Sequence, residues 1–334
     1  MQRQIVGIRE RLDFIWLELT SRCNLECVHC YADSSPERPL FEGMQLDDWI
    51  NALDQAATLG CKKVQFIGGE PTIYPGLPQL IEHARDIGFD HICVYTNGTH
   101  FTEKLKSVFV ANRVSLAFSV YGSNHSVHDQ ITQRNGSFAK TDRAVRWAVD
   151  AGLPVRASII QMNANAHDVR DTELMLREAG VAHIHVDRLR GLGRGAQERS
   201  EQPPLKELCG RCGDGKVCVS STGHIFPCVF ARFAALGHIK EDGLNKVCSG
   251  QPLHDFRDAL IDTHKSTPAH PSYASACTPE EPAPPCSPEI DPGPCGPEKT
   301  PPDCSPERPD PEVCPPERAA ITPLYPQASH SKVQ

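Results

Sequence analysis

Three cysteines near the N-terminus are spaced as ligands of a metal centre. Cys23, Cys27 and Cys30 directly follow an apolar, strand-like run at residues 14–20. A four-iron cluster normally takes four cysteine ligands, so a loop with three leaves one iron free to bind another molecule. The loop therefore indicates a site of chemistry, although the same spacing by itself also suits a zinc-binding loop.

Short apolar runs alternate with amphipathic segments between residues 14 and 190. Such alternation predicts right-handed crossovers and a parallel sheet. We therefore expect an α/β fold, a partial (β/α)6 TIM-type barrel, with its active residues at the carboxyl ends of the strands. The expected strands are 14–20, 63–67, 91–96, 114–120, 154–160 and 183–189, and the expected helices are 46–59, 77–87, 102–112, 138–151 and 168–179.

The last expected strand has one polar and one apolar face. His183, His185 and Asp187 share one side of it, because side chains alternate along a strand, whereas Ile184 and Val186 share the other. A polar face on a barrel strand is explained by a lumen, and exposure at a sheet edge is the alternative.

Composition divides the chain into three parts. Residues 1–265 carry 30 Lys and Arg against 32 Asp and Glu, whereas residues 266–334 carry 4 against 10 and hold 19 of the 29 prolines. The Pro-rich, acidic end cannot bury enough apolar surface to fold, and it repeats Cys-x-Pro-Glu five times between residues 277 and 317. We expect a catalytic core at 1–195, a small Cys-rich C-terminal domain at 196–265 and a disordered tail at 266–334.

Charge and hydropathy exclude some classes of protein. The body of the chain is close to neutral, so nothing indicates a nucleic-acid partner. No segment is long and apolar enough for a membrane span, and the N-terminus lacks a signal peptide. We therefore expect a cytoplasmic protein without membrane association, whose fifteen cysteines are metal ligands or reduced thiols.

At these motifs the chain resembles the radical S-adenosylmethionine (SAM) superfamily. The three-cysteine loop matches the superfamily's C-x3-C-x2-C signature, with His29 at the usual aromatic position, and residues 68–71 match its GGEP motif. Residues 119–138 and 187–195 are similar to the subgroup that carries a C-terminal SPASM or twitch extension. The resemblance extends from residue 14 to about residue 260.

The resemblance implies a cofactor set and a first reaction step. Cys23, Cys27 and Cys30 would hold a [4Fe–4S] cluster whose free iron binds SAM. Reductive cleavage of SAM would then yield a 5′-deoxyadenosyl radical for hydrogen abstraction. Glycines would let the backbone approach the ligand, and a carboxylate would accept from its ammonium group. The residues expected to bind SAM are His29, Gly68, Gly69, Glu70, Asn97 and Ser119.

A second cysteine set follows the barrel. Cys212, Gly223 and Cys228 fit the start of the SPASM pattern, but only Cys248 follows where several more cysteines are required. The resemblance therefore implies one auxiliary cluster rather than two. Its ligands would be Cys212 and Cys228 with two of Cys209, Cys218 and Cys248, and a zinc site or free thiols are the alternative.

Two reactions fit this reading. The first is the modification of a ribosomal peptide by crosslinking or epimerisation. The second is the oxidation or epimerisation of a small molecule such as a sugar or aminocyclitol in natural-product biosynthesis. Epimerisation would need a thiol as hydrogen donor, and Cys218 and Cys248 are the catalytic candidates. The resemblance further implies a reductant protein such as flavodoxin or ferredoxin. The repeats of the tail could bind metal, dock a partner or act as a peptide-like substrate of the same chain, and a low-complexity disordered tail without such a role is the alternative.

Overall fold

The computed structural model describes residues 11–198 and 204–265 of the chain. A nine-stranded sheet with the order β6-β5-β4-β3-β2-β1-β7-β8-β9 forms its centre. Strands β1 to β6 pair in parallel in sequence order, which confirms the predicted partial barrel. The strands are β1 (Phe14–Glu18), β2 (Lys63–Ile67), β3 (His91–Thr96), β4 (Ser115–Ser119), β5 (Val155–Gln161), β6 (His183–Arg188), β7 (Lys216–Val219), β8 (His224–Phe226) and β9 (Gly237–His238).

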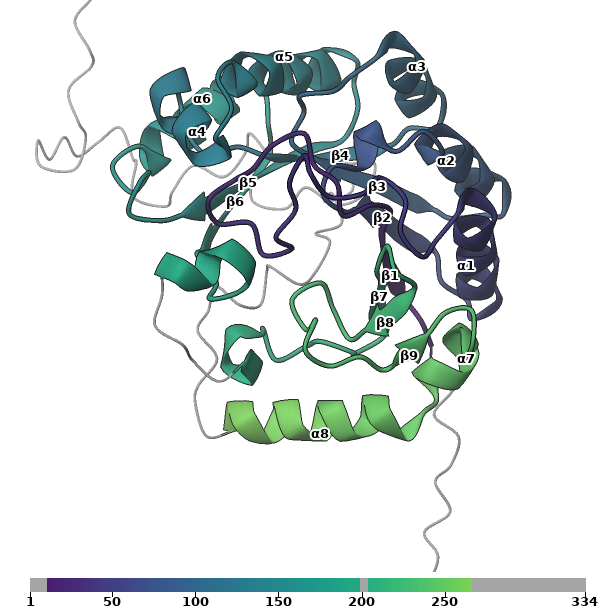
Figure 1. The fold of residues 1–334 in the computed structure, drawn as a ribbon. Coiled ribbons are helices and arrows are strands. Elements are labelled where there is room, and N and C mark those ends of the chain that lie inside the picture. Colours follow the sequence, from purple (N-terminus) through teal and green to yellow (C-terminus); the bar gives the residue numbers. More distant parts are fainter. Residues whose placement is uncertain (1–10, 199–203, 266–334) are drawn as a thin grey trace, which may run out of the picture. The chain divides into compact units, whose positions relative to one another are not determined.

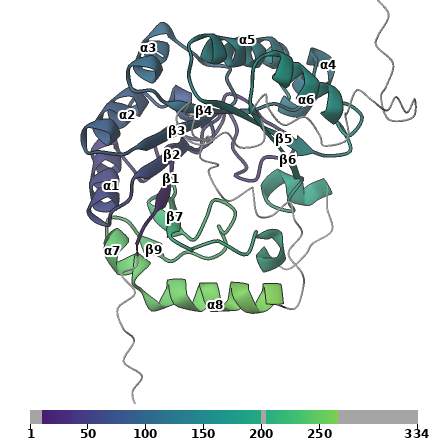
Figure 2. The same cartoon turned by 180° about the vertical axis from the view of Figure 1, so that it is seen from behind.

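Helices cover the outer face of the curved sheet (Figures 1 and 2). The five helices that the sequence predicted begin and end within two residues of their expected limits, whereas α4, α7 and α8 were not predicted. No described helix has the combination of length and apolarity that a membrane crossing requires. The helices are α1 (Leu46–Thr58), α2 (Leu77–Asp86), α3 (Glu103–Ala111), α4 (His125–Thr132), α5 (Ser137–Asp150), α6 (Val169–Glu178), α7 (Gly243–Cys248) and α8 (Gln251–Lys265).

The Cys-rich region continues the sheet of the barrel. Strand β7 pairs in parallel with β1, with Phe14 opposite Lys216, and β7 to β9 then form an antiparallel extension. Helix α8 packs its buried Phe256 and Leu260 against the cluster that contains Phe14 and four of the five cysteines of this region. The second cysteine set is therefore attached directly to the first strand of the barrel. The predicted domain limits at residues 195 and 265 stay predictions, and the tail lies outside the described residues.

Apolar side chains on the outer face of the sheet form the main core under the helices. Trp49 of α1, Phe66 of β2 and Phe118 of β4 are fully buried in it. Replacing a buried side chain of this size by alanine typically costs about 3–5 kcal/mol. This rigid layer fixes the strands, so their carboxyl ends and inner faces are free to carry polar groups.

Candidate active site at the carboxyl ends of the strands

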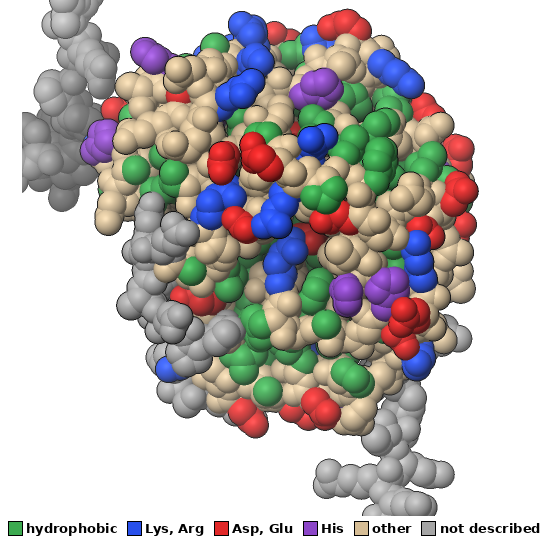
Figure 3. Space-filling model, in the orientation of Figure 1, with side chains coloured by type: hydrophobic (Ala, Val, Ile, Leu, Met, Phe, Trp, Pro, Cys, Tyr) green, Lys and Arg blue, Asp and Glu red, His purple; other side chains and the backbone are tan. Residues whose placement is uncertain are grey.

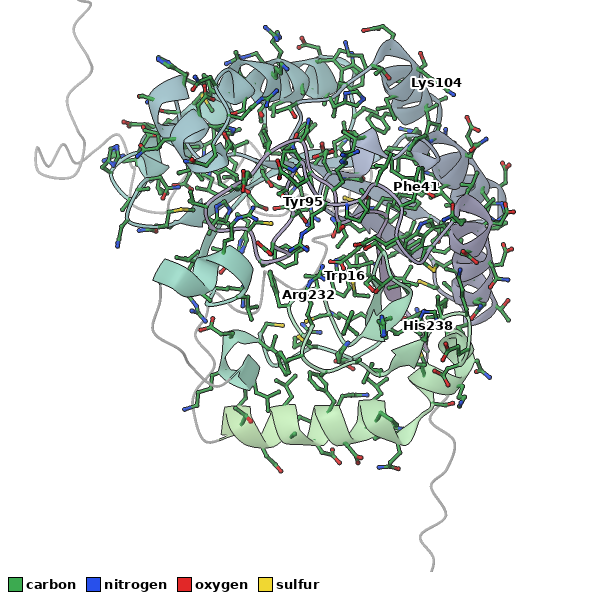
Figure 4. The ribbon with its side chains drawn as sticks, viewed as in Figure 1. Trp16, Phe41, Tyr95, Lys104, Arg232 and His238 are labelled. Atoms are coloured by element: carbon green, nitrogen blue, oxygen red, sulfur yellow. The ribbon has the colours of Figure 1, made fainter. Side chains whose placement is uncertain are left out.

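A cavity of about 250 Å³ lies on the inner side of the sheet. The aromatic residues Trp16 and Tyr95 point toward this interior, whereas Lys104 lies on the periphery (Figure 4). The three cysteines of the loop line the cavity together with every residue that the sequence predicted to bind SAM. These residues are Cys23, Cys27, Cys30, His29, Gly68, Gly69, Glu70, Asn97 and Ser119.

The polar face of β6 also lines the cavity. His183, His185 and Asp187 contribute to its wall, as the alternation along the strand predicted. Ile184 and Val186 instead pack against the core under the helices. The polar strand face is therefore explained by a lumen and not by a sheet edge in solvent.

The cysteine thiols are held in a desolvated loop. Burial raises the pKa of Cys23 to about 12, and the nearby charge of Glu70 adds to the rise. Burial also raises the pKa of Cys27 well above its ordinary value, with the neighbouring thiols Cys23 and Cys30 contributing. The thiols therefore prefer the protonated form. Because metal binds the thiolate form, cluster assembly in this loop must release protons.

The donor set of the loop fits an iron–sulfur cluster. Three thiols that influence one another electrostatically face one cavity. Among residues 11–198 and 204–265, no three Cys, His, Asp or Glu side chains converge tightly enough for a single metal ion. Thiolates that each bind a separate corner of a four-iron cluster need no such tight convergence. When bound, the cluster supplies the reductive cleavage of SAM.

Two glycines bring the end of β2 against the start of the cysteine loop. A Cβ atom on Gly68 would lie 2.5 Å from the Thr20 carbonyl oxygen, and one on Gly69 would lie 2.1 Å from that of Arg22. Gly69 donates its N–H to Thr20 O at 2.7 Å, and Glu70 donates to Arg22 O at 3.0 Å. The glycines were predicted to permit close approach to a ligand, and the structure shows that they permit close approach of two backbone segments.

Glu70 is a buried junction between β2 and β3. Its side chain is 1% exposed. One carboxylate oxygen accepts from the amide (3.0 Å) and hydroxyl (2.6 Å) of Thr72 and from the hydroxyl of Thr96 (2.7 Å), and the other accepts from the amide of Asn97 (2.7 Å). Burial raises the pKa of Glu70, and these four donors oppose the rise. The carboxylate thus fixes the segment that carries Asn97.

Asn97 connects this junction to the cysteine loop. Its Nδ2 donates to Asn24 Oδ1 at 2.9 Å and lies 3.7 Å from Cys23 Sγ. Asn24 in turn donates to Thr99 Oγ1 at 2.8 Å. The predicted contact of Asn97 with SAM stays a prediction, while its contacts with the loop show how the strand ends hold the thiols.

The ring of His29 packs at one end of a row of aromatic side chains. It packs edge-on against Tyr121, with centroids 4.5 Å apart, and Tyr121 lies against His128, which in turn contacts Phe138. Asp129 fixes the turn between α4 and α5 by accepting from the amide of Gly136 and from that of Phe138. Residues 119–138 therefore position the ring of His29 in the cavity.

His128 makes stability depend on pH. Its Nδ1 accepts from the Tyr121 amide at 3.2 Å, and burial lowers its pKa from 6.5 to about 4. The unfolded chain gains this proton near pH 6.5 but the folded chain only near pH 4, so stability is full above pH 6.5 and falls as the pH drops through this window. Between about pH 7 and pH 5, the free energy of unfolding of His128→Gln should therefore fall by about 2 kcal/mol less than that of the wild type.

Urea unfolding at a series of pH values checks this expectation. His100→Gln, at an exposed position, is the matched control and should follow the wild type. An identical pH dependence in His128→Gln and the wild type would show that His128 is not the titrating group.

Arg194 contacts the cysteine loop and is a residue of the site that the sequence reading missed. Its Nε donates to Cys27 O at 2.9 Å, one terminal nitrogen pairs with Asp33 at 2.9 Å, and the other donates to Ser34 O at 2.7 Å. Its amide donates to Cys30 O at 3.0 Å. The segment after β6 therefore clamps the cysteine loop from the far side. The motif at 187–195 marked this segment, but sequence alone gave it no partner.

The structure brings four of the five cysteines of the second set into one cluster. Cys212 and Cys228 have their sulfurs 2.8 Å apart, and the hydrogen bond between them and burial raise the pKa of Cys212. Cys209 and Cys218 lie in the same apolar cluster. Cys209 is disulfide-bonded, so the expectation of metal ligands or reduced thiols does not hold for this residue. Cys248 belongs instead to the core under the helices, near Cys61.

The neighbourhood of this cysteine pair suits bound metal. Burial raises the pKa of Cys228, but its hydrogen bond with Cys212 and those with the backbone of Phe230 and Ala231 lower it, and the positive charge of the buried Arg190 adds to the lowering. The Arg190 guanidinium lies 4.5 Å from the ring centroid of Phe230. Cys228 lines the cavity, whereas neither Cys218 nor Cys248, the candidates for a hydrogen donor, does so. The second cysteine set thus reaches the cavity through Cys228.

Sequence comparison identifies the two parts of the chain. A sequence model of the radical SAM superfamily matches residues 17–187, just over half of the chain, and the SPASM iron–sulfur cluster-binding domain matches residues 209–278. The subtilosin biosynthesis protein AlbA of Bacillus subtilis is 24% identical over 274 residues, which are 72% of this chain and 60% of AlbA. The PqqA peptide cyclase of Xanthomonas campestris is 30% identical over 194 residues, 58% of this chain and 51% of the cyclase. The chain thus spans between half and two thirds of these relatives.

Solved structures show the same fold. Streptococcus suis SuiB bound to S-adenosylmethionine superposes with a TM-score of 0.62 at 14% identity, over 74% of this chain and 68% of SuiB. The enzyme anSMEcpe with bound AdoMet superposes with a TM-score of 0.59 at 17% identity, over 74% and 80% of the two chains. In this chain the three-cysteine loop, the GGE junction and Cys228 of the Cys-rich unit line one cavity. The chain therefore belongs to the radical SAM superfamily and is a radical SAM enzyme with a SPASM domain, which uses a [4Fe–4S] cluster and SAM.

Proposed function

We propose that this radical SAM enzyme modifies a ribosomal peptide by crosslinking or epimerisation. The observation that carries the proposal is its similarity, over 58 to 74% of the chain, to proteins whose names describe the maturation or biosynthesis of peptides. One is the PqqA peptide cyclase. Others are the biosynthesis protein of the bacteriocin subtilosin and the sporulation killing factor maturation protein SkfB, which is 25% identical over 263 residues.

The geometry of the site supports the proposal. Cys23, Cys27 and Cys30 would hold the cluster that binds SAM, at one end of a cavity that continues along the polar inner face of β5 and β6. Cys228 borders the same cavity. A peptide that enters the lumen would therefore lie between the SAM site and the second cysteine set.

An auxiliary cluster at Cys212 and Cys228 would accept the electron that a crosslink releases. A new bond between two hydrogen-bearing groups removes two hydrogens, one as the atom taken by the 5′-deoxyadenosyl radical and one as a proton plus an electron. Cys218, which lies in the same cluster of side chains, would be a third ligand, and Cys209 would have to be released from its disulfide to serve as the fourth. We propose a flavodoxin or ferredoxin as the electron source and the cytosol as the compartment, since thiols stay reduced there.

The test begins with the genes beside that of this protein, where a short open reading frame would supply the candidate peptide. The cluster-loaded enzyme is given SAM, a reductant and this peptide with deuterium on its α-carbons. We expect deuterium in the 5′-deoxyadenosine that forms, and either the loss of two hydrogens per crosslink or an inverted centre in the peptide. Mass spectrometry and chiral amino-acid analysis measure these outcomes. Transfer of hydrogen from a sugar or aminocyclitol, with none from the peptide, would favour the small-molecule reaction instead.

A further inference from the structure

The arginines of the lumen differ in how their charges are balanced. Arg190 pairs with Asp187 at 2.8 Å, and Arg188 pairs with Glu207 at 3.2 Å. Arg156 also lines the cavity, but no carboxylate of residues 11–198 and 204–265 lies within ion-pair distance of it. Within the described part of the chain, Arg156 thus brings an uncompensated positive charge into the lumen.

The groups around Arg156 leave its donors available. Its guanidinium carbon lies 6.0 Å from the ring centroid of Tyr95, and one of its nitrogens lies 4.0 Å from Cys93 Sγ. That sulfur already accepts from Gln65 Nε2 at 3.2 Å, and Gln65 Oε1 accepts from Trp16 Nε1 at 3.0 Å. A guanidinium has five N–H donors in a fixed fork that matches a carboxylate, and a distant thiol satisfies little of it.

Basic and acidic side chains lie side by side near the middle of the face shown in Figure 3. Within the lumen, the neighbouring strand places His183 in register with Arg156 and His185 in register with Ser158. An anion at Arg156 would therefore meet no carboxylate from β6 at the paired positions. Because a partly buried charge without a partner is costly, the arrangement suits a ligand that brings the negative charge.

Arg156 lies deeper in the barrel than the cluster loop. It is in register with Ala117 of β4 and through it with Tyr95 of β3, two residues before Asn97, which contacts the loop. At about 3.3 Å per residue this separation is about 7 Å. The methionine carboxylate of bound SAM would be taken up by the free iron at the carboxyl edge, which favours a second molecule as the partner of Arg156, and the measurement of SAM affinity below separates the two.

We propose that Arg156 anchors the substrate by binding a carboxylate of an acidic peptide deep in the lumen. The proposal rests on the peptide-modifying function above and names the chemistry of the peptide. The aromatic faces of Tyr95 and Trp16 would contact the apolar stem of the acidic side chain. The Cys-x-Pro-Glu sequence that occurs five times between residues 277 and 317 is an example of such a peptide.

Peptide binding to the full-length, cluster-loaded enzyme tests the proposal. The probe is a fluorescent synthetic peptide with the sequence of residues 283–299 and blocked ends, and its partner has every carboxylate converted to the amide. With SAM present and reductant absent, no turnover occurs, and anisotropy gives Kd. We expect the wild type to prefer the acidic peptide about tenfold, Arg156→Gln to lose the preference and Arg156→Lys to retain part of it.

The control is Arg146→Gln, which changes a half-exposed arginine on α5 that pairs with Asp142. It should bind both peptides as the wild type does. SAM affinity, measured by equilibrium dialysis without peptide, should stay within about twofold in Arg156→Gln, because fold and cofactor site are then intact.

Three outcomes would overturn the proposal. One is equal affinity of the wild type for both peptides, and another is no binding of either. The third is a roughly tenfold loss of SAM affinity in Arg156→Gln with the peptide preference retained, which would assign Arg156 to the cofactor carboxylate. If a precursor peptide still transfers hydrogen to 5′-deoxyadenosine in any of these cases, the peptide-modifying function stands and only the anchor is refuted.

Discussion

Replacing Cys23, Cys27 and Cys30 together by alanine is expected to abolish SAM cleavage and to remove about four irons per chain. The three thiols face the cavity next to every predicted SAM contact, and no other described cysteine lies in that loop. Without them SAM has no iron to bind, so 5′-deoxyadenosine formation should fall to the level of a reaction without enzyme. Iron and sulfide analysis and chromatography of 5′-deoxyadenosine measure the two effects.

Two further variants make the experiment specific. Cys61→Ala removes a buried thiol that bonds to Lys63 O, away from the cavity, and should keep its iron and its cleavage activity. Cys212→Ala/Cys228→Ala should also lose about four irons but retain the other four. Persistence of 5′-deoxyadenosine formation in the triple variant would refute the assignment of the loop. Loss of all iron in the triple variant would refute the hypothesis of an auxiliary cluster.

Replacing Glu70 by alanine should destabilise the protein by about 3–5 kcal/mol and weaken SAM binding, because it leaves four buried donors without an acceptor. The donors come from Thr72, Thr96 and Asn97, and the last of these also holds the cysteine loop. Glu70→Gln keeps one oxygen for Thr72 and Thr96, but its amide nitrogen would face the N–H of Asn97. We therefore expect about half of the loss in this variant.

Urea unfolding and SAM affinity measure these effects side by side. Glu103→Ala is the control, because Glu103 is 88% exposed and its pair with Lys106 should contribute less than about 1 kcal/mol. A Glu70→Ala protein as stable as this control would show that the junction does not hold the strand ends. Normal stability with lost SAM affinity would instead indicate that Glu70 acts on the ligand alone.

The attachment of the Cys-rich unit explains how two sites share one cavity. Since β7 pairs directly with β1, the strand that leads into the cysteine loop also fixes the second cysteine set. Tyr31, the residue after Cys30, packs its ring against Phe230, with centroids 5.0 Å apart. Phe230 and Cys228 both line the cavity. The SAM-binding loop and the second cysteine set are thus held together by direct contacts.

Local patterns in the sequence predicted most of the barrel. Six strands and five helices were predictable because their apolar residues recur with the strand or helix period over the whole element. Helix α4 was not predicted, since it has only eight residues and its start depends on Asn124, whose side chain accepts from the Ser126 and Val127 amides. Strand β7 was not predicted, because its four residues are too few to show the alternation of a strand.

By itself, the sequence determined what chemistry this protein can begin. The spacing of Cys23, Cys27 and Cys30, with the GGE residues after the next strand, is a local signal, because each motif lies at the end of its own strand. Only the tertiary structure decided how these groups are held. Arg194 clamps Cys27 from 167 residues away, Glu70 holds Asn97 across two strands, and Cys228 rather than Cys218 or Cys248 reaches the lumen. Such contacts depend on which strands become neighbours in the sheet, and the residue pattern within one strand does not determine which strand pairs with it.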